Sequence, residues 1–210
     1  RSGAGLVTVA TPSSCLPIVA SLAPEYMTLP IAEAGDEPDA DAVELLLEQA
    51  RDVIAIGPGL GQGRATRVFI RRLVDQATVP LVVDADGLNA FAGDPDALSG
   101  RDGRPVIVTP HPGELARLVG MSTDEVQASR VEIARNFAVT HHLYVVLKGQ
   151  RTVIVTPDEK VFINPTGNPG MATGGSGDVL TGMIAAWLAQ LLDAEAACKL
   201  AVYLHGLAGD

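Results

Sequence analysis

The stretch Leu81-Val82-Val83-Asp84-Ala85-Asp86-Gly87-Leu88-Asn89 joins three consecutive β-forming apolar residues to an abrupt polar end. A short apolar run without polar alternation is typical of a strand that is buried on both faces of a sheet. Further runs of this kind stand at Val53–Ile56, Val106–Val108 and Leu143–Leu147. Between the runs, apolar residues recur at helical spacing, as in Thr66–Gln76. The sequence therefore predicts an α/β fold of three layers (α/β/α), in which a mostly parallel central sheet has helices on both faces.

The remaining predicted elements are a strand at Leu6–Ala10, a long helix from about Thr123 to His141, a β-hairpin formed by Arg151–Val155 and Lys160–Ile163, and two closing helices. Ser13 or Ser14 is placed to cap the helix that follows the first strand. The chain opens almost directly on a strand and stops just after a helical pattern. We therefore expect residues 1–210 to form a single domain that is truncated at both ends.

The composition is that of a globular chain. Of its 210 residues, 47% are apolar and 19% are charged, which excludes a disordered chain and a coiled coil. A formal net charge of −10 disfavours binding to nucleic acid or to an anionic membrane surface. No apolar run approaches the roughly 18–20 residues that cross a membrane. Cys15 and Cys198 lie far apart without a CxxC pattern, which favours a cytoplasmic location over a disulfide framework or a zinc site.

Clusters of glycine, proline and polar residues follow the predicted strands. In open parallel sheets, ligands bind outside the carboxyl ends of the strands, so these clusters are expected to converge on one edge. They are Gly57–Gly61, Asp84–Asn89, Thr109–Glu114 and Lys148-Gly149.

A fifth cluster, Thr173-Gly174-Gly175-Ser176-Gly177-Asp178, ends where an amphipathic helix begins. Glycines let consecutive N–H groups face one concavity, and a helix N-terminus adds about half a positive charge, so the loop predicts an anion hole for a phosphoryl group. Asp178 is placed to accept a proton from an attacking hydroxyl. The alternative is that Asp178 only complements the helix dipole. No GxxxxGK[ST] motif occurs, which excludes a P-loop enzyme.

Other side chains at the strand ends keep two interpretations each. Lys148 either holds a phosphate as a point charge or is a solvated residue at a strand end. A lone histidine is usually structural, but His111 stands between two prolines in a rigid turn at a strand end, which favours a ligand contact. Glu114 either orients a magnesium-bound water or caps the first turn of its helix. Asp84 and Asn89 are either ligand groups or turn formers.

Taken together, the motifs resemble those of a known family. Four motifs carry the resemblance, in this order: Ile56-Gly57-Pro58-Gly59-Leu60-Gly61, Asp84–Asn89, Thr109-Pro110-His111-Pro112-Gly113-Glu114 and Gly170–Gly182. They are similar to those of the ADP-dependent (S)-NAD(P)H-hydrate dehydratases of the ribokinase-like superfamily. The resemblance implies a repair enzyme that phosphorylates the C6 hydroxyl of hydrated NADH or NADPH and then eliminates phosphate. The implied products are NAD(P)H, AMP and inorganic phosphate.

The resemblance also implies roles for single residues. Asp178 matches the acid that contacts the hydrate and serves as base. The anion hole matches Gly174, Gly175, Ser176 and Gly177. The nucleotide-binding stretch matches Lys148, Gly149, Gln150, Arg151 and Thr152, together with Gly177. The positions that bind the hydrate match Gly59 or Gly61 and His111, and we assign Asn89 to the same substrate site. Glu114 matches a residue that contacts Mg²⁺ through water.

The co-substrate implied by the resemblance is ADP, or ATP as in eukaryotic relatives, with Mg²⁺ as cofactor. Its small-molecule partners are NAD(P)HX and ADP, with an NAD(P)HX epimerase either fused or separate. We expect a homo-oligomer. Two alternatives stay open: a ribokinase-like kinase for a small alcohol or vitamin precursor of the hydroxymethylpyrimidine or hydroxyethylthiazole type, and a non-catalytic nucleotide-sensing domain. Vitamin kinases usually carry Asn where His111 stands, which favours the dehydratase.

Overall fold

The computed structural model describes residues 2–49, 52–101, 103–191 and 193–210. A six-stranded sheet in the order β10-β9-β8-β7-β6-β5 forms its centre. The strands are β5 (Ile54–Ile56), β6 (Leu81–Val83), β7 (Val106–Val108), β8 (Tyr144–Leu147), β9 (Val153–Val155) and β10 (Val161–Ile163). Strands β5 to β8 pair in parallel, whereas β9 pairs antiparallel with both β8 and β10. The prediction of a mostly parallel sheet is confirmed, and so is the β9–β10 hairpin.

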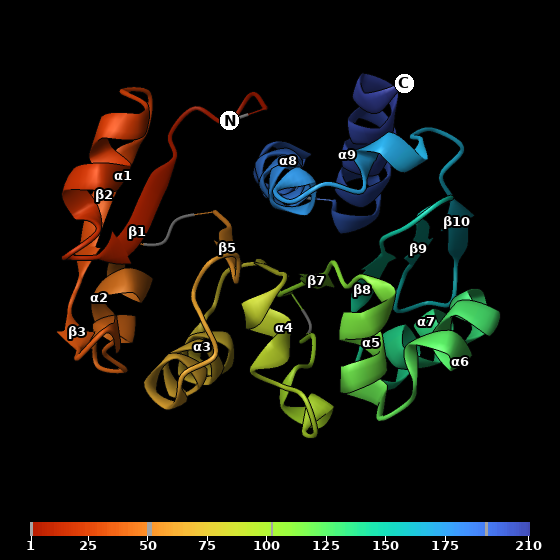
Figure 1. Ribbon diagram of the computed structural model, residues 1–210, viewed down its shortest axis with the longest axis horizontal. Coiled ribbons are helices and arrows are strands. Elements are labelled where there is room, and N and C mark those ends of the chain that lie inside the picture. The colour runs from red at the N-terminus through yellow and green to blue at the C-terminus, as the bar shows by residue number, and fades with distance from the viewer. Residues whose placement is uncertain (1, 50–51, 102, 192) are drawn as a thin grey trace.

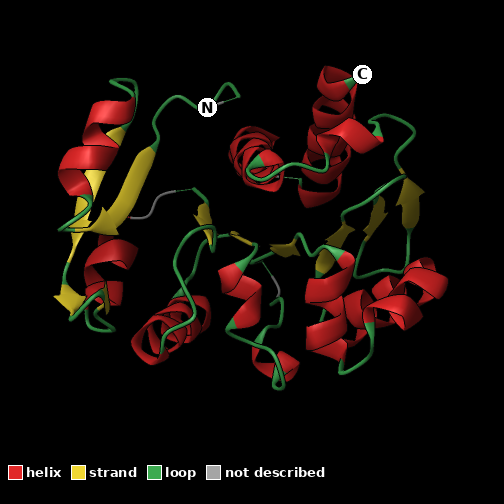
Figure 2. Cartoon of the chain, viewed as in Figure 1, coloured by secondary structure: helices red, strands yellow, loops and turns green. Residues whose placement is uncertain are grey.

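Helices cover both faces of this sheet (Figure 1). On one face lie α3 (Arg64–Gln76), α4 (Asp86–Asn89), α5 (Pro112–Val119), α6 (Thr123–Ala128) and α7 (Arg130–Thr140). The other face carries α8 (Ser176–Leu191) and α9 (Ala194–Gly209), and Figure 2 shows the sheet between the two helical layers. The predicted three-layer arrangement is therefore confirmed.

Alternation of side chains along each short strand explains the two layers. Val82 and Ile107, the middle residues of β6 and β7, pack with α8 and α9. Their neighbours along the strands pack with α3, α5 and α7. Because successive side chains of a strand point to opposite faces, three buried residues are enough to serve two cores.

The N-terminal elements form a smaller unit beside the central sheet. They are β1 (Thr8–Pro12), α1 (Leu16–Leu22), β2 (Met27–Ile31), β3 (Glu33–Ala34), β4 (Glu37–Pro38) and α2 (Ala42–Gln49). Strands β1 and β2 pair in parallel as a separate two-stranded sheet. The unit is attached to α3, since the Glu37 carboxylate accepts the Thr66 backbone N–H at 2.8 Å and Arg72 pairs with Asp41 at 2.7 Å.

Two local predictions were wrong. Neither Ser13 nor Ser14 caps α1, because the Ser13 hydroxyl donates to the Ile31 carbonyl and the Ser14 hydroxyl donates to Glu33. The long helix predicted from Thr123 to His141 is two helices, with Ser129 between them in a non-helical conformation. Two 3₁₀ turns, η1 (Pro95–Ala97) and η2 (Pro169–Met171), complete the described elements. Among the described residues, none of the helices has both the length and the apolar character that crossing a membrane requires.

The carboxyl end of α9 holds the loop that leads to the glycine-rich cluster. Asn168 Nδ2 donates to the Gly209 carbonyl at 2.5 Å, and the Gly167 N–H donates to Asp210 at 2.9 Å. Gly206 faces Thr166 so closely that a Cβ there would lie 2.8 Å from the Thr166 carbonyl carbon. The absence of a side chain at Gly206 therefore lets the loop lie directly on the helix.

This contact predicts that Gly206→Ala destabilises the protein although alanine favours helix. The new methyl group has to displace the Thr166 backbone, and such overpacking costs about 1–3 kcal/mol. The matched control is Gly182→Ala in α8, where a Cβ meets nothing within 4 Å. There the helix is expected to gain about 0.5–1 kcal/mol. Urea unfolding of both variants measures the difference, and equal shifts would contradict the packing argument.

Candidate functional site

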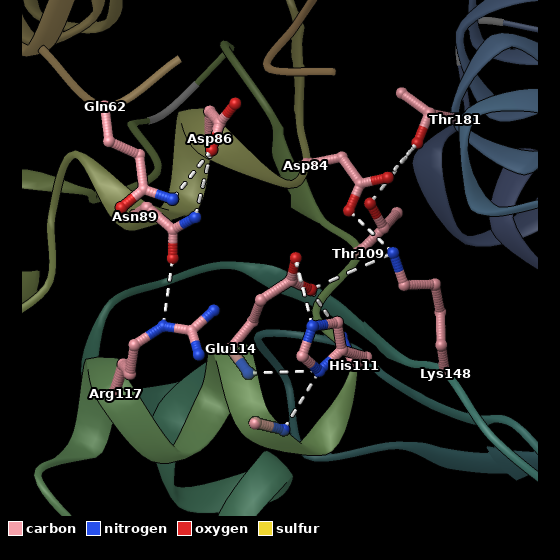
Figure 3. Close-up of polar contacts among 11 residues, drawn as sticks. Gln62, Asp84, Asp86, Asn89, Thr109, His111, Glu114, Arg117, Lys148 and Thr181 are labelled. Atoms are coloured by element: carbon pink, nitrogen blue, oxygen red, sulfur yellow. Dashed lines mark hydrogen bonds and ion pairs between the residues drawn. The ribbon is translucent and has the colours of Figure 1, made fainter. Parts of the chain in front are cut away.

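The polar clusters at the carboxyl ends of the strands meet at one edge, as predicted. The backbone N–H of Gly61, after β5, donates to Asp86 Oδ2 at 2.9 Å. The backbone N–H of Lys148, after β8, donates to the Pro110 carbonyl at 2.8 Å, which joins the ends of β8 and β7. Figure 3 shows Asp84, Glu114 and Lys148, which follow β6, β7 and β8, pointing toward one another. Residues from four strand ends therefore form one site.

A strained turn sets the direction of the acidic side chains after β6. Ala85 has φ +47° and ψ −119°, a conformation that costs a non-glycine residue about 1–3 kcal/mol. The turn sends Asp84 into the interior, where it is 1% exposed, and leaves Asp86 at the Gly61 backbone. Residue 57 has to be glycine, because a Cβ atom at this position would overlap the Asp84 carbonyl group.

Lys148 lies at the centre of the site. Its Nζ is 2.7 Å from Asp84 Oδ1 and 3.9 Å from Glu114 Oε2. A Cβ at Gly177 would lie 3.1 Å from the same Nζ, so the ammonium group lies directly against the start of α8. The Lys148 side chain is 19% exposed. The hypothesis of a solvated lysine at a strand end is therefore wrong, because the ammonium group is held between two buried carboxylates.

Asp84 also binds α8. Thr181 Oγ1 donates to Asp84 Oδ2 at 2.7 Å, and the hydroxyl of Thr109 lies 3.5 Å from that of Thr181. Each oxygen of the Asp84 carboxylate thus has its own partner, one directly after β8 and one on α8.

His111 and Glu114 form the N-terminal cap of α5. His111 Nδ1 accepts the backbone N–H groups of Gly113 and Glu114, and the Glu114 carboxylate accepts the His111 N–H at 2.7 Å. The other ring nitrogen, Nε2, lies 3.5 Å from Glu114 Oε1. The capping interpretation of Glu114 is confirmed. The His111 ring remains half exposed, with 51% of its side chain accessible.

Asn89 bridges two neighbouring groups. Its Nδ2 donates to Asp86 Oδ1 at 3.2 Å, and its Oδ1 accepts Arg117 Nε at 3.0 Å. This chain of contacts joins α4 and α5 to the Gly61 loop, because Asp86 also accepts the Gly61 N–H. Both hydrogen-bonding atoms of Asn89 are therefore engaged within the protein.

The glycine-rich cluster lies at the N-terminus of α8. Gly175 has φ +86°, and the Ser176 hydroxyl lies 3.5 Å from His205 Nε2 on α9. Burial lowers the pKa of His205. Asp178 is exposed in the first turn, and within the described ranges its carboxylate has no hydrogen bond or ion pair. Within the loop the Ser176 N–H donates to the Thr173 carbonyl at 3.4 Å, and the free Asp178 carboxylate lies two residues further along.

The Lys148–Thr152 turn is shaped by a basic side chain on α7. Gly149 has φ +138° and Arg151 has φ +54°. Arg130 donates to the carbonyls of Gln150, Leu147 and Lys148 at 2.8, 3.1 and 3.2 Å. Burial lowers the pKa of the Arg130 guanidinium. The turn that follows Lys148 is therefore held by three carbonyl contacts from one residue.

The acidic residues of the site fit a magnesium ion only if phosphate groups and water supply most of its ligands. In the described part of the chain, no group of three or more His, Cys, Asp or Glu residues is placed to hold a metal. Asp84 is occupied by Lys148, and Glu114 Oε2 by the His111 N–H. Mg²⁺ in nucleotide sites is commonly bound by phosphates and water with one or two carboxylates, which is compatible with contact to Glu114 through water.

Sequence reasoning missed three contributors to this site. Thr181, Arg117 and Arg130 stand outside the glycine-rich clusters, and their partners are 97, 28 and about 20 residues distant in sequence. The helical period places Thr181 near Asp178 on α8, but no pattern in the sequence connects it with Asp84.

The comparison with protein families gives a match over the whole chain. The family model described as NAD(P)H-hydrate dehydratase matches residues 1–210. The chain is 49% identical over 213 residues to the bifunctional NAD(P)H-hydrate repair enzyme Nnr of Moorella thermoacetica, with 100% of this chain and 40% of that protein covered. The chain therefore spans about 40% of the length of this curated relative.

Solved structures give the same fold. One is the ADP/ATP-dependent NAD(P)H-hydrate dehydratase from Bacillus subtilis, co-crystallised with ATP and Mg²⁺ (TM-score 0.79, 35% identity, 99% of this chain and 70% of that chain). Another is a ribokinase-like superfamily protein from Enterococcus faecalis V583 (TM-score 0.79, 33% identity, 98% and 69% covered). The ribokinase-like α/β fold is thereby confirmed.

The contacts of Arg130 predict that Arg130→Met loosens the turn after β8. Three backbone carbonyls lose their donor, so the amide hydrogens of residues 148–151 are expected to exchange about tenfold faster, a loss of about 1.4 kcal/mol in local opening free energy. Arg135→Met, at an exposed position of the same helix, is the control. Hydrogen exchange followed by mass spectrometry measures both, and unchanged protection in the Arg130 variant would contradict the assignment.

Proposed function

We propose an activity for this chain from its family, because it belongs to the NAD(P)H-hydrate dehydratases. The proposed reaction converts (S)-NADHX and (S)-NADPHX to NADH and NADPH, with ADP as co-substrate. The observation that carries the proposal is the meeting of three kinds of group at one edge: an anchored ammonium group, a glycine-rich helix start and a free carboxylate. Phosphoryl transfer requires positioning and electrostatic stabilisation, and these groups supply both.

In the proposed reaction, phosphorylation turns a poor leaving group into a good one. Asp178 accepts the proton of the C6 hydroxyl as its oxygen attacks the terminal phosphorus of ADP. The bond between that phosphorus and the bridging oxygen breaks, which leaves AMP. The amides of Gly174, Gly175, Ser176 and Gly177 stabilise the charge on the transferring group. Loss of phosphate from C6 and of a proton from C5 then restores the ring double bond.

The two substrates are proposed to occupy opposite sides of Asp178. The nucleotide lies along Lys148, Gly149, Gln150, Arg151 and Thr152, with Gly177 at its phosphates. The hydrate lies near Gly59 or Gly61 and His111, whose ring is accessible. Asn89 belongs to this second side, where it joins Asp86 to Arg117.

Mg²⁺ is proposed to arrive with the nucleotide, and Glu114 would hold it through water. When bound, the ion neutralises phosphate charge. We further propose that residues 1–210 are one domain of a cytoplasmic homo-oligomer that binds neither nucleic acid nor membrane. The NAD(P)HX epimerase activity would stand in the same polypeptide or in a separate protein.

The reaction predicts that the absorbance of reduced nicotinamide returns when the intact protein meets hydrated NADH, Mg²⁺ and ADP. AMP and phosphate should form in a 1:1 ratio with NADH. Parallel reactions with ATP identify the phosphoryl donor. Nucleotide binding without recovery of NADH would refute the dehydratase and redirect the search to small alcohols, for which a stable phosphorylated product is the signature.

The role of Asp178 predicts that Asp178→Asn lowers kcat by about 10²–10⁴-fold, the usual contribution of a general base. The ADP dissociation constant should change by less than about threefold, because the base acts in the transition state. Asp124→Asn is the matched control, since Asp124 is likewise an exposed acidic residue in the first turn of a helix, α6, where it complements the helix dipole. If Asp178→Asn were as mild as Asp124→Asn, Asp178 would be a dipole partner and not a base.

A further inference from the structure

The Asp84 carboxylate is the most deeply buried charged group of the site. It is 1% exposed, and its two oxygens bind Lys148 Nζ and Thr181 Oγ1, each at 2.7 Å. Lys148 approaches from the end of β8, and Thr181 lies on α8, one turn after Asp178. A single carboxylate thus joins the lysine to the helix that carries the glycine-rich loop (Figure 3).

We propose that Asp84 and Thr181 are positioning residues that fix the Lys148 ammonium group relative to the start of α8, so that it meets the phosphates of the bound nucleotide. The inference rests on the proposed function, since that function places a nucleotide at this helix start. It assigns a role to two residues whose contact with each other and with Lys148 lies within the protein.

Physical chemistry gives the reason for such an anchor. A lysine side chain has four flexible carbon–carbon bonds, and holding it in one conformation for binding reduces affinity unless the conformation is already fixed. Asp84 fixes the ammonium group before a nucleotide arrives. A Cβ at position 177 would lie 3.1 Å from Lys148 Nζ, so the glycine leaves the space that the ammonium group needs at the start of α8.

Stability alone does not account for the arrangement. Replacing a buried ion pair by apolar residues of similar volume is often neutral or stabilising, so a buried aspartate is not needed to fill this space. The strained Ala85 turn, which directs Asp84 inward, adds a further local cost. The buried aspartate and the strained turn are both explained if their role is to fix the position of Lys148.

Thr181 offers a test that leaves both charges in place. Thr181→Val removes the link between the carboxylate and α8, so Lys148 is no longer fixed relative to the start of that helix. We expect the ADP dissociation constant to rise about fivefold and kcat to fall about tenfold. Thr181→Ser keeps the hydroxyl and should restore both values. Urea unfolding reports how far the variant is destabilised.

A matched control separates positioning from the general loss of a buried hydroxyl. Thr156 Oγ1 also donates to an aspartate, Asp158, while Thr156 is 1% exposed at the opposite edge of the sheet. Thr156→Val should destabilise the protein to a similar degree and leave the ADP dissociation constant and kcat unchanged.

The decisive measurement is a double-mutant cycle in which isothermal titration calorimetry measures the ADP dissociation constant of each variant. Its background is Asp84→Asn with Lys148→Met, in which both charges are removed together so that neither is left buried alone. If Thr181 acts through Asp84 and Lys148, Thr181→Val changes the ADP dissociation constant about fivefold in the native background and less than about 1.5-fold in the altered one. Equal effects in both backgrounds, or none in either, would overturn the inference.

The cycle is independent of the repair reaction. A chain that binds ADP but does not restore NADH would refute the proposed function, while the cycle would still decide the role of Asp84 and Thr181. A chain that binds no ADP would overturn the positioning role, because Lys148 would have no phosphate to meet.

Discussion

The buried ion pair between Lys148 and Asp84 is the interaction on which the arrangement of the site depends. It joins the ends of β6 and β8, strands separated by β7 in the sheet, and extends through Thr181 to α8. Removing one partner of such a pair commonly costs about 3–5 kcal/mol, because the other charge stays buried without compensation. The ion pair therefore holds the strand ends and the start of α8 in one relative position, and replacing only one of its two residues is expected to destabilise the protein.

That ion pair requires a sheet whose strand ends are themselves fixed, and the two cores provide this. Val82 packs toward α8 and α9, whereas Leu81 and Val83 pack on the other face. A one-residue slip of β6 would exchange these faces and bury Asp84 in the wrong layer. The register that protects the core thus also sets the direction of the carboxylate.

The sequence predicted the strands far better than the contacts between their ends. Leu81–Val83 and Val106–Val108 have the predicted bounds, because each is a run of three β-forming apolar residues with turn residues on both sides. The predicted helix from Thr123 to His141 hid a break at Ser129, since both halves share a helical period. The parallel sheet was enough to predict that the polar clusters converge on one edge, but it did not predict which residue pairs with Lys148. Asp84 is 64 residues away, and only the packed structure shows that it turns inward while Asp86 turns to the Gly61 loop.

The opposite edge of the sheet is concave as well. A hollow of about 760 Å³ lies at the amino ends of β7 and β8, lined by residues that include Arg101, Tyr144 and Asp193. Two of its charged side chains already have structural partners, since Arg101 pairs with Asp75 at 2.9 Å and the Asp193 side chain caps α9. At the carboxyl ends, by contrast, the Asp178 carboxylate has no partner within the described ranges and α8 begins with N–H groups that lack intrahelical acceptors. Groups that folding leaves without partners are the ones available to a ligand, which is why we propose that the chemistry takes place at the carboxyl ends of the strands.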